Sequence, residues 1–239
     1  MEIFDSEREA IVKRFLSSGG NVTEALKEID PNKWKQFLIL NYRGIIRDFG
    51  QATYDGFKSR FLQLERKEFD PYQELILAYI EEVAAEKVVM ITETTMLQTR
   101  RIIQKYREEE RTIDEIAREL DKNFDDYSTH RAFRIARTEV NAASNYGGYM
   151  GAEQASEETG DLVKEWIDSR DDRVRDSHKR KPAGVGGEKI RFYRKFSNGL
   201  FYPGDMVNGP AKEVIHCRCT LIYHPLAYID PGEIDPGRP

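Results

Sequence analysis

Residues 131–148 read RAFRIARTEVNAASNYGG and predict a long amphipathic helix. At about 100° per residue, polar side chains fall on one narrow stripe of this helix, and apolar side chains fill the opposite side. Glu139 falls inside the apolar side. The polar stripe, which we interpret as a solvated face, consists of Arg134, Thr138, Asn141 and Asn145.

A carboxylate among apolar side chains must be paired or have a shifted pKa, because an isolated buried charge is too costly. The C-terminal half of the chain offers Glu139 three cationic partners, Arg173, Arg175 and His178. We expect such a pair to form an interdomain clamp. A catalytic Glu139 is the alternative, although structural ion pairs perturb carboxylates equally well.

The residues before this helix read as further helices. Asp30-Pro31 and Asp70-Pro71 each place an N-cap residue before a proline that suits the first helical turn. Both dipeptides therefore predict helix starts.

Two more helix starts are predicted further along the chain. Thr112 and Glu115 form a Thr-x-x-Glu capping box, in which each side chain accepts a hydrogen bond from the backbone of the other residue. Ser128 can cap the next helix, which is predicted to end near Gly147 and Gly148.

After Gly160 the spacing of apolar residues changes from helical to alternating. Residues 190–196 and 214–223 alternate as half-buried strands do, and Gly- and Pro-rich loops lie between them. We therefore predict an α+β fold, with an elongated, mainly helical N-terminal part and a small antiparallel β/loop C-terminal domain. The predicted parts are a helical domain at 1–150, a small α+β domain at 151–225, and an extended Pro/Gly tail at 226–239 with two Ile-Asp-Pro-Gly copies.

The composition indicates a protein kept in a reducing cytoplasm. Charged residues make up 33% of the 239 residues, and no apolar run approaches the roughly 18 residues of a spanning helix. The N-terminus, MEIFDSEREA, lacks the basic and apolar regions of a signal peptide. We therefore expect no membrane contact and no disulfide between Cys217 and Cys219.

Charge is distributed unevenly along the chain. The net charge of -5 argues against non-specific nucleic-acid binding by the whole surface. Residues 173–195, however, hold nine basic residues against two acidic ones, so this basic stretch could face phosphate or an acidic partner; a solvated loop is the alternative. Its basic residues are Arg173, Arg175, Lys179, Arg180, Lys181, Lys189, Arg191, Arg194 and Lys195.

The two cysteines and one histidine could hold a metal. Two thiols at positions i and i+2 of a strand point the same way, as zinc ligands do. Ile215 and Leu221 share the face of Cys217 and Cys219, which favours buried core thiols instead. We therefore predict no cofactor, with zinc bound by these cysteines and His178 as the alternative.

The loop 168–175, DSRDDRVR, could position a metal and a phosphate as a nuclease does. Its acids and bases are interleaved, however, so internal salt bridges would satisfy them. The sequence offers no phosphate-binding glycine loop and no nucleophile–base pair. We therefore predict that the protein is not an enzyme, and a metal-dependent hydrolase or nuclease is the alternative.

Several motifs follow one another in a recognisable order. They are the helix 131–148, the Lys164-Glu165-Trp166 strand, the loop 168–175, Ser177-His178, the Pro203-Gly204-Asp205 turn and, last, the Cys217-Arg218-Cys219 motif. Over roughly residues 100–225 the chain thereby resembles the phage head morphogenesis family, named for the F protein of phage Mu and the minor head protein of phage SPP1. Motifs in a fixed order are more specific than any one alone.

The resemblance implies a minor head protein of a tailed bacteriophage, made in the host cytoplasm and packaged inside the head at the portal vertex. It would act in head morphogenesis or genome delivery. The implied partners are the portal protein and other head proteins, with genomic double-stranded DNA and further copies at the portal vertex as additional ones. A DNA-binding protein ejected with the genome is an alternative. Some relatives carry a toxin or nuclease domain after the shared region, and we expect none after Cys219.

The resemblance is incomplete for the metal. Relatives whose metal-binding motif looks complete have a Cys-x-x-Cys pair and, later in the chain, a His-x-x-Cys-x-Cys motif. In this sequence, Arg175 and His178 occupy the two positions of the Cys-x-x-Cys pair, and Val214 occupies the position of the later histidine. The implied ligand set is therefore His178, Cys217, Cys219 and a fourth group from His224, Asp205 or water.

Overall fold

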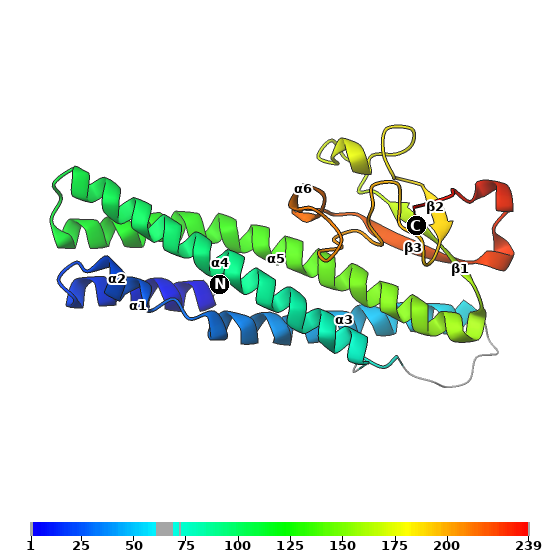
Figure 1. The fold of residues 1–239 in the computed structure, drawn as a ribbon, viewed down its shortest axis with the longest axis horizontal. Coiled ribbons are helices and arrows are strands. Elements are labelled where there is room, and N and C mark those ends of the chain that lie inside the picture. Colours follow the sequence, from blue (N-terminus) through cyan, green and yellow to red (C-terminus); the bar gives the residue numbers. More distant parts are fainter. Residues whose placement is uncertain (1, 61–68, 72, 239) are drawn as a thin grey trace. The chain divides into compact units, whose positions relative to one another are not determined.

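The computed structural model describes residues 2–60, 69–71 and 73–238. Helices make up its N-terminal part and a small antiparallel sheet lies toward its C-terminus (Figure 1), which confirms the predicted α+β class. The chain divides into two compact units, one of residues up to 40 with 81–135 and one of residues 41–80 with 136 onward. No helix in the described ranges combines the length and the apolar composition that crossing a membrane requires.

The first unit is helical. It contains α1 (Glu2–Ser17), α2 (Val22–Leu26) and parts of α3 (Pro31–Arg60), α4 (Glu74–Glu108) and α5 (Ile113–Thr159). Its core removes one apolar face of these helices from water, which is the main source of stability in a helical unit. The core residues are Ile11, Phe15, Ala25, Leu26, Ile29, Ile103, Ile116, Ala117, Leu120 and Phe124.

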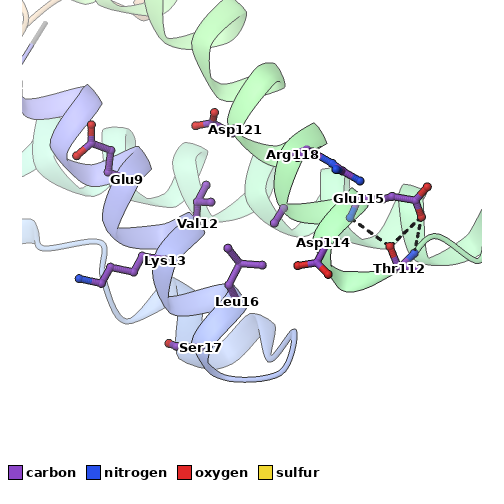
Figure 2. A pocket seen from close by; sticks show the side chains of 11 residues that line it. Glu9, Val12, Lys13, Leu16, Ser17, Thr112, Asp114, Glu115, Arg118 and Asp121 are labelled. Atoms are coloured by element: carbon purple, nitrogen blue, oxygen red, sulfur yellow. Dashed lines mark hydrogen bonds between the residues drawn. The ribbon is translucent and has the colours of Figure 1, made fainter.

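Two predicted helix starts are confirmed in this unit. Asp30 Oδ1 accepts a hydrogen bond of 2.9 Å from the Asn32 N–H, with Pro31 as the first helical residue of α3. Before α5, the Glu115 N–H donates to Thr112 Oγ1 at 3.3 Å, and the Thr112 N–H donates to Glu115 Oε2 at 2.9 Å (Figure 2). Both caps satisfy N–H groups that the first helical turn leaves unpaired.

The predicted helix start at Asp70-Pro71 is wrong, because α4 begins at Glu74. Asp70 instead exchanges two hydrogen bonds with Gln154 of α5. Its N–H donates to Gln154 Oε1 at 2.9 Å, and its carbonyl accepts from Gln154 Nε2 at 3.2 Å. A tertiary contact has therefore replaced the local cap.

The predicted boundaries at Ser128 and at Gly147-Gly148 are also wrong. Helix α5 is continuous over 47 residues, through Ser128 and Gly147 to Thr159. It is followed by Gly160, whose φ of 79° suits the residue after a helix.

Close packing explains why glycines lie inside α5. A Cβ on Gly147 would lie 2.7 Å from the carbonyl oxygen of Ile46 in α3, and a Cβ on Gly151 would lie 2.3 Å from that of Gly50. Both distances are well below van der Waals contact. Only glycine therefore allows the two helices to approach so closely at these points.

The sheet belongs to the second unit. It consists of β1 (Leu162–Ile167), β2 (Lys189–Arg191) and β3 (Thr220–Pro225), in the order β2-β1-β3. Strand β1 pairs antiparallel with both neighbours. This order leaves β2 as an edge strand, opposite β3.

The two alternating stretches form strands only in part. Strand β2 ends at Arg191, and residues 192–194 of the stretch 190–196 form a turn and a bend. In the stretch 214–223, the short helix α6 (Ala211–Val214) and a turn through His216, with φ 60°, precede β3. The cysteines therefore lie in the loop before β3 and not on a regular strand.

The predicted tail is docked rather than free over the residues that are described. It forms the short 3-10 helices η2 (Leu226–Tyr228) and η3 (Pro231–Glu233), and an isolated bridge joins Arg238 to Lys195. The domain boundaries at 150 and 225 stay predictions.

Candidate functional site

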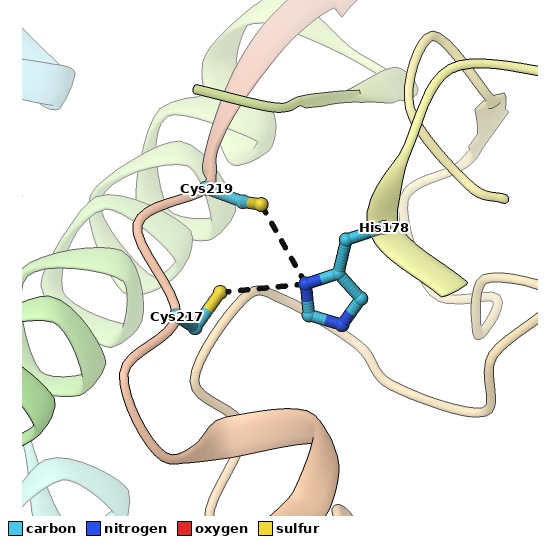
Figure 3. A group of neighbouring side chains, drawn as sticks. All are labelled: His178, Cys217 and Cys219. Atoms are coloured by element: carbon cyan, nitrogen blue, oxygen red, sulfur yellow. Dashed lines mark hydrogen bonds between the residues drawn. The ribbon is translucent and has the colours of Figure 1, made fainter. Parts of the chain in front are cut away.

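His178, Cys217 and Cys219 form one buried cluster. Each of the three is at most 3% exposed, and their ligand atoms all lie within 4.8 Å of one another. The Sγ atoms of both cysteines lie 3.6 Å from Nδ1 of His178 (Figure 3). The structure therefore brings together the three metal candidates that the sequence suggested.

Helix α5 positions the loop that carries the cysteines. The side-chain amides of Asn141 and Asn145 both donate to the Cys219 carbonyl at 3.1 Å. Thr138 Oγ1 accepts a hydrogen bond of 3.2 Å from the His216 N–H. The interpretation of this polar stripe as a solvated face is therefore wrong for these three α5 residues.

Glu213 orients the histidine. It follows Lys212 in α6, and its Oε2 lies 2.9 Å from Nε2 of His178 and accepts a hydrogen bond of 2.8 Å from Ser177 Oγ. A proton on Nε2 leaves the Nδ1 lone pair facing the thiols. Metal-binding histidines are commonly held in this way by a carboxylate on the other ring nitrogen.

The two thiols differ in acidity. A hydrogen bond from Cys219, assisted by the charge of Arg175, lowers the pKa of Cys217, although burial opposes this. The same hydrogen bond together with burial raises the pKa of Cys219. The first proton thus leaves more easily than the second, as expected for two thiols that share one proton. Thiolates are the form in which cysteine binds a metal.

The donor set fits a borderline-soft cation such as Zn²⁺, which prefers sulfur and imidazole ligands. The two further ligands considered from the sequence lie in other networks. His224 pairs with Glu165 at 3.1 Å. Asp205 accepts backbone hydrogen bonds from Phe201 at 3.0 Å and Asn208 at 3.1 Å. Neither belongs to the cluster, so water is the remaining candidate for a fourth ligand.

Two members of the predicted interdomain clamp, Glu139 and Arg175, have other partners. Glu139 is buried and accepts a hydrogen bond from the hydroxyl of Tyr42 in α3. The guanidinium of Arg175 donates to the backbone carbonyls of Lys212 and Ile215, the latter at 2.5 Å. Arg173 is exposed. An ion pair between Glu139 and these arginines stays a prediction.

Acidic side chains pair with much of the basic stretch 173–195. In the loop 168–175, Asp171 pairs with Arg218 at 2.5 Å, which lowers the pKa of Asp171. Ion pairs between exposed groups are individually weak, so other anions can compete for the paired cations. The pairs within or beside the stretch are Lys179–Asp176, Lys181–Asp235, Lys189–Glu233 and Arg191–Asp161.

Lys164 is a buried residue that sequence reasoning missed. It is fully buried on β1, and its Nζ has no hydrogen-bond partner within the described residues. Burial lowers its pKa to about 7, opposed by the charge of Asp205. Its burial could have been predicted, because Leu162, Lys164 and Trp166 lie two residues apart and therefore on the same face of a strand. The rings around Nζ are those of Tyr149 at 5.0 Å, Phe201 at 5.1 Å, Phe196 at 5.4 Å and Phe192 at 5.7 Å.

The first unit also contains an open groove. Figure 2 shows Val12 and Leu16 of α1 facing Asp114 and Arg118 of α5 across it. Charged and apolar side chains alternate along its walls, without the convergent polar groups typical of a small-molecule site.

The fold and the buried cluster together define a mainly helical α+β protein in which one long helix holds a small sheet and a Cys/His loop. The family model described as Phage Mu protein F like protein matches residues 108–222. Over these residues the chain is similar to this family, and the resemblance seen in the sequence is confirmed. No curated protein and no solved structure matches the chain.

Proposed function

We propose that this chain is a phage head protein, a minor component located inside the head at the portal vertex, where it acts by binding other head components. The observation that carries the proposal is the Mu F-like match, which includes the α5 stripe, most of the sheet and the cysteine loop. Its partners would be the portal protein and other head proteins. The helical first unit would supply surfaces for them, and several copies around the portal axis would bind with avidity.

The buried cluster supports a structural rather than a catalytic role. A substrate must reach reacting atoms, whereas His178, Cys217 and Cys219 are almost completely covered. In the loop 168–175, the carboxylate of Asp171 is engaged by Arg218. These two observations favour the non-enzymatic reading over a hydrolase or nuclease.

Quantitative mass spectrometry of purified phage particles tests the location. We expect a fixed copy number, far below that of the major capsid protein and in constant ratio to the portal protein. Loss of the protein on triggered DNA release would identify it as ejected, and retention would place it on the portal. Absence from mature particles would overturn the proposal and favour an assembly factor or an enzyme.

Zinc would stabilise the cysteine loop by joining it to η1 (Asp176–His178) through His178, Cys217 and Cys219. Structural zinc contributes directly to folding free energy, because both thiolates and the imidazole are brought together only in the folded state. Zn²⁺ titration of the chelator-treated protein should give one site per chain and a higher melting temperature. Cys217→Ser with Cys219→Ser should abolish both effects, while His224→Gln, outside the cluster, should preserve them. Equal responses of the two variants would exclude this ligand set.

The basic stretch would contact the packaged genome. Lys and Arg side chains that neutralise phosphates release counterions, so binding weakens steeply as salt increases. Fluorescence anisotropy with a DNA duplex at several salt concentrations measures this dependence. A flat salt response, or no binding at about 0.1 M salt, would remove DNA from the set of partners.

A further inference from the structure

The C-terminal tail pairs with the edge strand β2 at Lys189. The Asp235 N–H donates to the Lys189 carbonyl at 2.6 Å, and the Lys189 N–H donates to Asp235 Oδ2 at 3.0 Å. Asp235 thereby pairs with both backbone groups of one β2 residue. An edge strand presents unpaired backbone groups that can bind another chain, and the tail occupies them here.

A second contact fixes the tail three residues further on. Arg238 and Lys195 exchange backbone hydrogen bonds of 2.6 and 3.0 Å. Between these contacts, Gly237 has φ 62°, and a Cβ there would lie 3.0 Å from both Arg194 Cβ and the Lys195 carbonyl oxygen. The docked conformation therefore requires glycine, which indicates a specific contact and not a chance position.

Carboxylates of the tail form ion pairs with lysines of the basic stretch. Asp235 pairs with Lys181, and Glu233 pairs with Lys189 and raises its pKa. The side chains of Lys181 and Glu233 are about half exposed, so the pairs face solvent. Such pairs are individually weak and are screened by salt, so a denser array of negative charge can replace them.

We propose that the tail, residues 229–238, is an autoinhibitory strap whose carboxylates occupy Lys181 and Lys189 in place of the phosphates of duplex DNA. This inference rests on the DNA contact proposed above. In the docked state two lysines are neutralised locally, and the protein binds DNA through the remaining cations. When the tail is displaced, both lysines become free to contact phosphates, so affinity and salt dependence rise together.

The repeated tetrapeptide supplies a matched control. Asp230 and Asp235 both stand in Ile-Asp-Pro-Gly, and Asp230 Oδ1 accepts a hydrogen bond of 2.8 Å from its own Gly232 N–H. Asp230→Asn and Asp235→Asn remove the same charge from the same local sequence. Only Asp235→Asn removes a carboxylate from Lys181.

Anisotropy titrations of the full chain with a fluorescent DNA duplex test the strap. At about 0.1 M salt, one additional phosphate contact should raise the affinity of Asp235→Asn roughly fivefold to tenfold and steepen the logarithmic salt slope by about 0.9. Asp230→Asn should bind like wild type. Adding Lys181→Gln to Asp235→Asn should abolish the gain.

The outcomes separate the strap from the DNA contact itself. If wild type binds DNA and the two asparagine variants bind equally, the strap is wrong and the DNA contact stands. If no form binds DNA, both are wrong. If Asp235→Asn still raises the affinity for DNA when Lys181→Gln is also present, the strap is also wrong, because the gain would then not come from Lys181.

Discussion

Gly151 of α5 lies against the backbone of Gly50 in α3, so closely that a Cβ on Gly151 would lie 2.3 Å from the Gly50 carbonyl oxygen. Neither helix can move away from the other at this point without losing packing contacts between them. The close approach of α3 and α5 therefore depends on the absence of a side chain at Gly151, as it does at Gly147.

Gly151→Ala is expected to destabilise the protein by about 1–3 kcal/mol or more, the usual cost of overpacking. Gly56→Ala is the matched control, since a Cβ at this α3 glycine meets nothing within 4 Å. Alanine there should stabilise the helix by roughly 0.5–1 kcal/mol. Urea unfolding of both variants measures the difference, and a shift in the same direction for both would show that the helices are not locked at Gly151.

Lys164 should make stability depend on pH. Its pKa falls from the usual 10.5 to about 7 on folding, so the native chain binds fewer protons than the unfolded chain between these values. The contribution of Lys164 to stability is therefore lowest and constant below pH 7 and becomes more favourable as pH rises from 7 to 10.5, by at most about 1.4 kcal/mol per pH unit. The groups that face Lys164 are the four rings around it and the Asp205 carboxylate.

Lys164→Met should remove this dependence and stabilise the protein at pH 6. Unfolding free energies between pH 6 and pH 9 provide the measurement, and Lys195→Met serves as the control because Lys195 is only partly buried over the Phe201 ring. A pH slope that survives in Lys164→Met would assign the proton uptake to another group.

Glu213→Gln should weaken zinc binding about 10-fold to 100-fold, the usual effect of removing a partner that orients a ligand. Its carboxylate is expected to hold the proton on His178 Nε2, which an amide does less well. Competition with a chromophoric chelator gives the affinity. Glu165→Gln is the control, because Glu165 has the same relation to His224 outside the cluster. Identical affinities for both variants would show that Glu213 does not position the histidine.

Replacing both Asn141 and Asn145 by alanine should cost about 1–3 kcal/mol, because the Cys219 carbonyl loses both side-chain donors. Hydrogen exchange over residues 215–221 should accelerate more than exchange elsewhere. Arg134→Ala, at an exposed position of the same helix, should leave exchange in this segment unchanged. Uniform acceleration across the chain would indicate a general loss of stability and not release of the loop.

Local signals in the sequence predicted local structure well. The Thr112–Glu115 box and the Asp30 cap are confirmed, because each is satisfied within four residues of its own helix. The α+β class is confirmed for a similar reason, since apolar spacing changes near Gly160 whatever the tertiary packing.

Errors arose where distant residues decide the structure. Gly147 reads as a helix end, yet it lies inside α5 because Ile46 approaches it. Asp70 reads as a cap, yet it binds Gln154. The three cluster residues were named from the sequence as the alternative metal ligands, but Glu213 was missed because nothing in its neighbourhood indicates a distant imidazole.

The two asparagine amides on the Cys219 carbonyl have a consequence for the thermodynamics of binding at the cysteine loop. The loop would become ordered when the chain folds, so its loss of conformational entropy would not oppose the binding of a ligand. A cation entering such a preorganised site would therefore bind with little conformational change, and its heat of binding would report mainly dehydration of the ion and deprotonation of the thiols. A chain without these amides would have to order the loop around each ion, with a correspondingly unfavourable entropy.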